Sequence, residues 1–304
     1  MVHRNHRAII RPAEDTMKTI KKIKSAPGGH WVGDGFPVRS LFSYQGDTAE
    51  ISPFLMFDFA GPYHFDPAAS PRGVGAHPHK GFETVSIVFD GEVSHRDSAG
   101  HGGTIGPGDV QWMTAGQGIV HQEFHSEAFT RSGGTFHMAQ LWVNLKASDK
   151  SAPPGYQALT AAAIPVVNLP HGAGTVRLIA GDFDGQKGAA RTFTPMKVWD
   201  VTLAPGGEAT LTTPAAHNTL LVPMTGTATV NGGERLAEAD LALFNHDGDS
   251  FTLASAEGAR LLLLSGEPIA EPVVGYGPFV MNSQAEIRQA ITDYNAGRFG
   301  EIAG

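Results

Sequence analysis

The sequence of 304 residues contains no cysteine. This absence excludes disulfide bonds, thiolate nucleophiles, iron–sulfur clusters and zinc sites built on cysteine. It agrees with a reducing compartment, and we expect a cytoplasmic protein. Long apolar runs are also missing, because even the leucine run at 261–264 ends after four residues. Such runs are far too short to cross a bilayer, so we expect no membrane partner.

Charged residues are scarce, at 17% of the chain, and the 30 acidic residues outnumber the 22 basic ones. A protein devoted to binding nucleic acid normally presents a basic face, so we expect no direct contact with nucleic acid. Glycine and proline, in contrast, are frequent, with 38 and 20 residues. High glycine and proline with low charge indicate many short strands and tight turns.

Strand-like segments rich in β-branched and aromatic residues recur along the whole chain. Examples are 83–89, 110–113, 198–203, 219–222, 241–244 and 260–264. Asp90-Gly91 and Asn231-Gly232 follow two such segments and are typical of hairpin turns. Short strands at intervals of roughly 8–12 residues predict an all-β sandwich or barrel, not a parallel α/β sheet.

The chain divides near its middle, where Pro153-Pro154-Gly155 cannot continue a helix or a central strand. We expect a linker at 148–155 between two strand-rich domains, 18–147 and 156–270, whose similar size suggests a duplicated fold. Residues 1–17 are expected to be a disordered or extra tail, with Met17 as an alternative start.

The C-terminal tail, 271–304, carries the one clear amphipathic helix, over 285–295. Its apolar residues are spaced at i, i+3, i+4 and i+7 and are Ile287, Ala290, Ile291 and Tyr294. Gly297 follows as the residue that ends the helix. We expect this helix to pack back on the body of the protein.

The residues that point to chemistry are two pairs, each with one residue between its members. His77 and His79 form the first pair, and His121 and Glu123 form the second. Side chains alternate faces along a strand, so the members of each pair point the same way. If the two strands are neighbours in one barrel, three imidazoles and one carboxylate converge. These ligands suit a divalent first-row metal with open positions for substrate, oxygen or water.

Three longer motifs make the sequence similar to the pirin family of the cupin superfamily. They are HPHKGFETVSIVFDGEVSHRDSAGHGG, PGDVQWMTAGQGIVHQE and GEPIAEPVVGYGPFVMNSQAEIRQAITDYNAGRFG. The resemblance covers about Lys18 to Gly300. It implies a bicupin, in which two jelly-roll barrels face each other and only the N-terminal barrel holds a metal. The implied ion is one divalent metal per chain, usually Fe(II), although Mn, Co, Ni, Cu or Zn suit the same ligands.

The resemblance implies His77, His79, His121 and Glu123 as the metal ligands. Many cupins use a glutamate at the position of Glu83 instead, so this residue is the alternative carboxylate. We assign Glu123 as ligand and catalytic base, and Glu83 as an acceptor that orients a histidine ring. Further pocket candidates are Phe57, Phe82, Trp112, Met113 and Trp142, for each of which core packing is the default. His125 has the same parity as His121 and could also line the pocket, although we expect it to lie past the end of the strand.

The family implies two functions of different classes. One is a quercetin 2,3-dioxygenase, in which a small flavonol-like aromatic substrate and O2 meet at the metal. The other is a non-catalytic, redox-sensitive regulator that binds a protein partner in transcription or metabolism. An orphan metalloprotein acting on another enol or phenol is a third interpretation. The C-terminal barrel lacks the paired histidines, so we expect it to be metal-free, and the protein to be a monomer.

Overall fold

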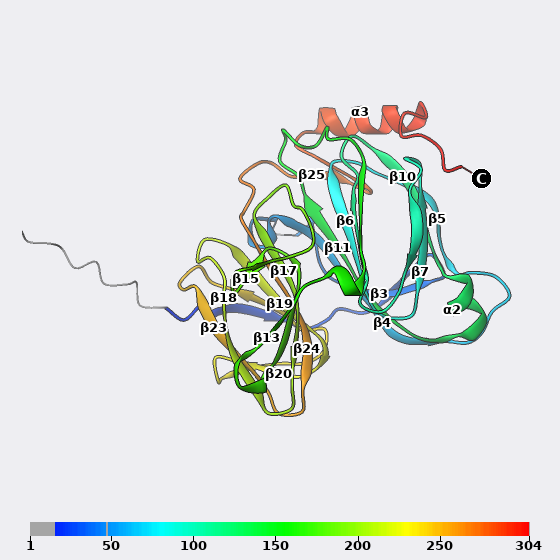
Figure 1. Cartoon of the computed structure of the whole chain (residues 1–304). Coiled ribbons are helices and arrows are strands. Elements are labelled where there is room, and N and C mark those ends of the chain that lie inside the picture. Colours follow the sequence, from blue (N-terminus) through cyan, green and yellow to red (C-terminus); the bar gives the residue numbers. More distant parts are fainter. Residues whose placement is uncertain (1–15, 47, 304) are drawn as a thin grey trace, which may run out of the picture.

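The computed structural model describes residues 16–46 and 48–303. Two β-barrels account for most of these residues, and each combines a seven-stranded with a four-stranded sheet (Figure 1). The strands of these sheets pair antiparallel, as expected when short strands are joined by tight turns. The predicted all-β fold with two barrels is therefore confirmed.

The first barrel holds the strands with the paired histidines. Its larger sheet runs in the order β12 (Gly155–Leu159), β9 (Val110–Thr114), β6 (Phe82–Asp90), β11 (Gly134–Asn144), β4 (Phe54–Phe65), β3 (Phe36–Ser43) and β2 (His30–Val32). Its smaller sheet runs in the order β5 (Gly73–His79), β10 (Ile119–His125), β7 (Val93–Asp97) and β8 (Gly102–Ile105). The candidate ligands thus lie on two adjacent strands of the smaller sheet.

The second barrel repeats this plan. Its larger sheet runs in the order β1 (Ile20–Lys24), β22 (Leu241–Phe244), β19 (Asn218–Gly226), β24 (Ala259–Gly266), β17 (Met196–Leu203), β14 (Gly174–Ala180) and β13 (Val166–Asn168). Its smaller sheet runs in the order β18 (Gly207–Thr212), β23 (Ser250–Ser255), β20 (Ala228–Val230) and β21 (Glu234–Leu236). Trp199, Phe251 and Leu263 belong to the apolar cluster between these two sheets, so side chains fill this interior.

Short elements connect the barrels and close their ends. They are α1 (Thr48–Ile51), α2 (Glu127–Ser132), α3 (Gln284–Asn295), the 3-10 turns Ala161–Ala163 and Pro170–Gly172, and two hairpins, β15 (Asp182–Phe183) with β16 (Gln186–Lys187) and β25 (Val274–Tyr276) with β26 (Phe279–Met281). No helix among the described residues is both long and apolar enough to cross a membrane.

The barrels pack against each other through their larger sheets. Phe57 and Val85 from the first barrel share one buried cluster with Val198, Leu220 and Leu264 from the second. Both faces of the first barrel's larger sheet are therefore buried, one against the second barrel and one toward its own interior. The residues of β4 and β6 that face the second barrel cannot also face the first barrel's interior, because strand side chains alternate.

Two segments pair across the predicted domain boundaries. The strand β1 joins the larger sheet of the second barrel, with Lys24 opposite Leu241. The strand β12 joins the first barrel, with Tyr156 opposite Met113. Residues 1–15 of the predicted N-terminal tail lie outside the described residues, whereas Met17 already bridges to Ser250.

The predicted C-terminal helix is confirmed as α3, which lies across one end of the first barrel (Figure 1). The Ser283 side chain accepts a hydrogen bond from the amide of Glu286 and so caps the helix start. Ile287 and Ala290 are buried in a cluster that includes Val120 of β10. The last helix thus packs directly against a strand that carries candidate ligands.

Candidate metal centre

The strands β5 and β10 are direct neighbours, as the predicted site requires. His121 lies opposite His77, and a bulge then shifts the register so that Glu123 lies opposite Val74. The backbones come close enough that a Cβ on Gly73 would lie 2.2 Å from the carbonyl oxygen of Glu123. Glycine is therefore required at this position, where the two strands approach most closely.

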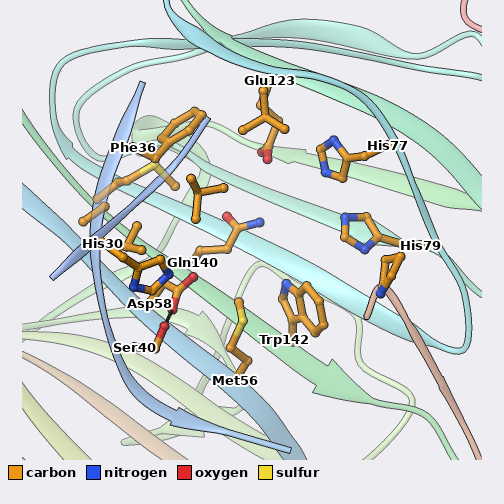
Figure 2. Close-up of a pocket in the computed structure, with 16 residues that line it drawn as sticks. His30, Phe36, Ser40, Met56, Asp58, His77, His79, Glu123, Gln140 and Trp142 are labelled. Carbon is orange, nitrogen blue, oxygen red and sulfur yellow. Dashed lines mark hydrogen bonds between the residues drawn. The ribbon is translucent and has the colours of Figure 1, made fainter. Parts of the chain in front are cut away.

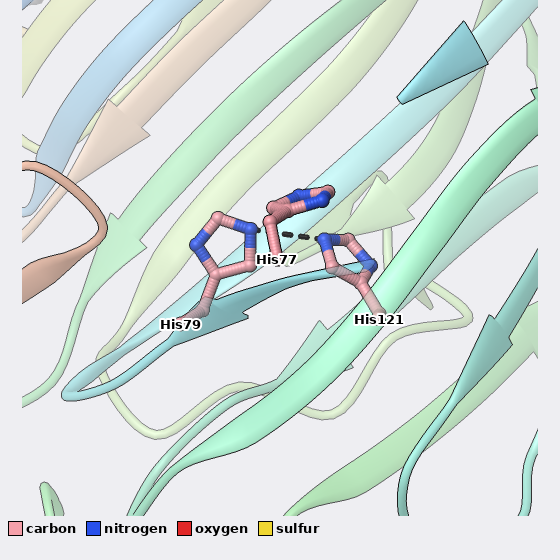
Figure 3. A group of neighbouring side chains, drawn as sticks. All are labelled: His77, His79 and His121. Atoms are coloured by element: carbon pink, nitrogen blue, oxygen red, sulfur yellow. Dashed lines mark hydrogen bonds between the residues drawn. The ribbon is translucent and has the colours of Figure 1, made fainter. Parts of the chain in front are cut away.

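The three histidines meet at one point of the barrel wall (Figure 3). Nε2 of His79 lies 2.9 Å from Nε2 of His121, and one ligand atom from each of the three rings falls within 4.8 Å of the others. Two ligands at right angles, each about 2.1 Å from a metal, would be about 3 Å apart. The two Nε2 atoms are thus spaced as neighbouring ligands of one ion.

The third histidine is oriented by its own strand. Nδ1 of His77 donates a hydrogen bond to the carbonyl oxygen of Gly75 at 2.8 Å, which leaves the lone pair of Nε2 available to a metal. Nδ1 of His79 and of His121 are buried and have no partner among the described residues.

Burial keeps all three rings neutral. It lowers the pKa of His79 and of His121 well below the usual histidine value, and the neighbouring histidines lower both values further. Burial also lowers the pKa of His77, against the opposing effect of its bond to Gly75. Only a neutral imidazole offers a lone pair to a metal, so at neutral pH all three rings are in the form that could bind one.

Glu123 enters the same pocket beside His77 (Figure 2). Its carboxylate is not part of the three-histidine group, and Ser86 Oγ donates to its Oε1 at 3.4 Å. Burial raises the pKa of Glu123 to about 7, while the Ser86 hydroxyl acts in the opposite direction. A buried carboxyl of this kind gains stability from a nearby cation, which would favour its ionised form.

The pocket in front of the histidines has a volume of about 440 Å³ and mostly apolar walls. Most of its wall comes from β2, β3, β4 and β11, which lie across the barrel from β5 and β10. Its lining residues are His30, Val32, Phe36, Val38, Ser40, Met56, Asp58, Ala60, Val74, His77, His79, Glu123, Met138, Gln140, Trp142 and Pro278. Small-molecule sites are typically concave and apolar with a few polar groups, as here.

The structure corrects the role expected for Glu83. Its carboxyl accepts a hydrogen bond from the Thr114 hydroxyl at 2.8 Å, not from a histidine. Glu83 shares its strand face with Val85 and Ile87, which pack in the cluster between the barrels. The strand β5 ends at His79 and β6 begins at Phe82. Because a turn separates the two strands, the alternation of side-chain faces in β5 does not continue into β6 and does not place Glu83 on the face of His79.

Five other pocket candidates also lie elsewhere. Phe57 and Trp112 belong to the cluster between the barrels, and Met113 packs with Ala115 and Ile119. Phe82 lies one layer behind the pocket, stacked on Trp142 with ring centroids 4.3 Å apart. His125 is enclosed by phenylalanines and bonds to the Gly35 carbonyl oxygen through Nε2 at 2.9 Å.

Most of the residues that line the pocket were not singled out from the sequence, and Ser40, Met56, Asp58 and Gln140 are among them. Gln140 Oε1 accepts from Ser86 Oγ at 2.6 Å, and the same hydroxyl reaches Glu123. The sequence does not decide whether Trp142 lies in the pocket or in the core. In the structure it lines the pocket and packs edge-on against the His79 ring, with ring centroids 5.3 Å apart. A polar residue among the apolar residues of a strand is the one signal that could have identified Asp58.

The C-terminal tail contacts the turns next to the strands that carry the candidate ligands. Lys80, which follows His79, pairs through Nζ with the Asp293 carboxylate of α3 at 3.4 Å. The Phe299 ring packs on Gly118 just before β10, at a place where a Cβ would lie 2.4 Å from it. Pro278, from the same tail, lines the pocket. The site therefore includes parts of the chain that are about 200 residues apart.

Family comparisons match both halves of the chain. The Pirin family model matches residues 35–143, and the model of the pirin C-terminal cupin domain matches residues 198–300. These two matches coincide with the first barrel and with most of the second.

Individual relatives cover nearly the full length. A Pseudomonas aeruginosa protein named "Putative quercetin 2,3-dioxygenase" is 54% identical and covers 93% of this chain and 99% of its own. A solved quercetin 2,3-dioxygenase of Acinetobacter baumannii has a TM-score of 0.91 and 49% identity, covering 95% of this chain and 100% of its own. An Escherichia coli pirin solved with nickel(II), at 20% identity and a TM-score of 0.64 over 82% of this chain and 99% of its own, shares the fold. The chain belongs to the pirin family.

Proposed function

We propose that the first barrel holds one divalent metal through His77, His79, His121 and Glu123. The observation that carries this proposal is the meeting of the His79 and His121 Nε2 atoms, 2.9 Å apart, at the wall of the pocket that Glu123 also enters. Three neutral imidazoles and one carboxylate fit a first-row divalent ion, of which Fe(II) is our first choice. Mn, Co, Ni, Cu and Zn suit the same ligands.

We further propose that the protein is an oxygenase that opens the ring of a flavonol-like substrate with O2. Both oxygen atoms of O2 enter the products, and one ring carbon leaves as carbon monoxide. The support is the similarity to proteins named as quercetin 2,3-dioxygenases, together with a pocket whose walls suit a flat apolar molecule. A metal bound at the site would orient the substrate and lower the pKa of its hydroxyl group.

The residues of the pocket supply the remaining functions. The Glu123 carboxylate, which a metal bound beside it would keep ionised against the effect of burial, is placed to accept the proton of the substrate hydroxyl. The Ser86 hydroxyl lies 2.6 Å from Gln140 Oε1 and 3.4 Å from Glu123 Oε1, so its single proton can be donated to either oxygen and restricts where the carboxylate lies. Trp142 provides a flat wall beside His79, and the valines and phenylalanine opposite exclude water.

The test has two stages. First, purified protein grown with iron should hold about one metal per chain, and His121→Ala and Glu123→Ala should each lose most of it. The exposed His101→Ala is the matched control and should keep the metal. A chain without metal after growth with iron would contradict the metal centre.

In the second stage, protein reconstituted without oxygen with each of the six metals receives quercetin and then air. We expect loss of flavonol absorbance together with release of carbon monoxide, and neither with Glu123→Ala. Loss of absorbance without carbon monoxide would contradict ring opening by this reaction. Metal-loaded protein that is inactive with every ion would favour the regulator that binds a protein partner.

A further inference from the structure

The wall of the pocket that lies across from the histidines carries a second group of polar side chains. Asp58 and Ser40 project from β4 and β3 on the side opposite His77 and His79, and His30 lies next to them (Figure 2). Gln140 lies between the two sides in this view. The pocket therefore has one polar end at the metal ligands and another at Asp58.

Asp58 occupies an unusual position for a carboxylate. It is 7% exposed, and its neighbours Phe57 and Phe59 on β4 are fully buried against the second barrel. Charged groups are rarely buried without a partner, because their desolvation is costly. Burial accordingly raises the pKa of Asp58, while the Ser40 hydroxyl and nearby His30 act in the opposite direction.

The described residues fill only part of the hydrogen-bonding capacity of the Asp58 carboxylate. Oδ1 accepts a hydrogen bond from Ser40 Oγ at 2.5 Å. Within residues 16–46 and 48–303, Asp58 has no ion pair and no second side-chain hydrogen bond. A carboxylate has about four lone-pair sites, so acceptor capacity remains on the side that faces the pocket. Oδ2 is thus free to accept from a ligand.

The surroundings limit what that ligand can be. Apart from the residues at the two polar ends and Gln140, the lining residues are apolar, among them Val38, Met56, Ala60 and Met138. A ligand that reaches both ends must be apolar in its middle and carry a hydrogen-bond donor at the end remote from the metal. A neutral hydroxyl fits better than an ammonium group, whose desolvation in this apolar space would be costly.

We propose that Asp58, held by Ser40, is the specificity-determining residue of this pocket and accepts a hydrogen bond from a phenolic hydroxyl at the far end of the substrate. The substrate class is then a flat phenol or enol that binds the metal at one end and carries a second hydroxyl at the other. This inference rests on the proposed function for the metal end and adds the recognition of the opposite end.

The experiment compares two ligands that differ only at the far end, 3-hydroxyflavone and 3,4′-dihydroxyflavone. Their affinities for metal-loaded protein are measured without oxygen through quenching of tryptophan fluorescence, since Trp142 lines the pocket. We expect the dihydroxy ligand to bind at least about tenfold more tightly, the usual effect of a hydrogen bond to a carboxylate. Asp58→Ala should remove this preference, and Asp58→Asn, which keeps an acceptor oxygen, should retain part of it.

Two further variants separate recognition from structure. Met56→Leu changes an apolar neighbour in the same wall, so it should alter both affinities equally and leave their ratio unchanged. Ser40→Ala removes the hydroxyl that holds Asp58 and should reduce the ratio several-fold. If Asp58→Ala does not fold, Asp58→Asn and Ser40→Ala still measure the ratio.

Equal affinities in the wild type, or an unchanged preference in Asp58→Asn and Asp58→Ala, would overturn the role of Asp58. These outcomes are distinct from failure of the proposed reaction, because binding is measured without turnover. A preference that depends on Asp58 in a protein without dioxygenase activity would refute only the reaction. Turnover of both flavonols with equal affinity would refute only the role of Asp58, and failure of both ligands to bind would refute both proposals.

Discussion

Replacing Glu83 by glutamine tests whether its carboxyl group faces the second barrel, as the structure shows, or the candidate metal site. The residue occupies the position at which many cupins place a metal-binding glutamate, yet here its carboxyl is bonded to Thr114 on the face toward the second barrel. Glutamine has nearly the same shape and keeps an oxygen to accept from the Thr114 hydroxyl. Glu83→Gln should therefore retain the metal and the fold.

The variant should also change how stability depends on pH. Burial raises the pKa of Glu83 from 4.5 to about 7 in the folded protein, although the Thr114 hydroxyl lowers it. The folded state then binds the proton more tightly than the unfolded chain, so the stability this group contributes is present below pH 4.5 and is lost as the pH rises through 7. The pKa of Glu83 differs by about 2.5 between the folded and unfolded states, and a difference of 1 in pKa corresponds to about 1.36 kcal/mol. The pH-dependent contribution of Glu83 to the free energy of unfolding is therefore about 3 kcal/mol at most.

Urea unfolding at pH 5 and pH 8 measures this effect. Glu83→Gln should be close to wild type at pH 5 and more stable at pH 8, by up to about 3 kcal/mol. Glu127→Gln, on the exposed surface of α2, is the matched control and should show no such gain. Loss of metal in Glu83→Gln, or equal stability of variant and wild type at both pH values, would refute the placement of Glu83 described above.

Three other measurements follow from the structure. Lys150→Met should lower the free energy of unfolding by about 2–4 kcal/mol, because the Lys150 ammonium donates to the carbonyls of Gly81 and Val280 and to Asn144. The exposed Lys187→Met should have little effect in the same urea titration, and an equal loss in both would contradict this role. Ser86→Ala should raise the pKa of Glu123 and shift metal uptake, followed by calorimetry, to higher pH. An unchanged pH midpoint would show that the Ser86 hydroxyl does not support the ionised carboxyl. A metal present at a hundredfold excess over its Kd should stabilise the folded protein by about 2.7 kcal/mol, and addition of a chelator should reverse the increase in melting temperature.

The alternation of side chains along a strand predicts correctly which residues of the same strand share a face. It placed His77 with His79 on one face and His121 with Glu123 on one face, and the pairing of β5 with β10 brings these faces together. The family motifs supplied the rest of the architecture, including two barrels and a helix at the C-terminus.

Alternation failed where it was carried across a turn or where both faces of a strand are buried. Glu83 would share the face of His79 if the alternation continued from one strand into the next, but the turn at Lys80 and Gly81 separates two strands in different sheets. In β4 nearly every residue is apolar, so the sequence does not show that Phe57 faces the second barrel while Asp58 faces the pocket. Only the packing of the two barrels decides between these faces.

The ion pair of Lys80 with Asp293 and the packing of Phe299 on Gly118 have a consequence for biosynthesis. A ribosome makes the histidine-bearing strands early, but the helix that fixes their turns emerges only with the final residues. These contacts with the two turns can form only after the C-terminal residues have been synthesised. A chain that ends before Asp293 would lack both contacts, so its candidate ligand turns would have less support from the rest of the molecule.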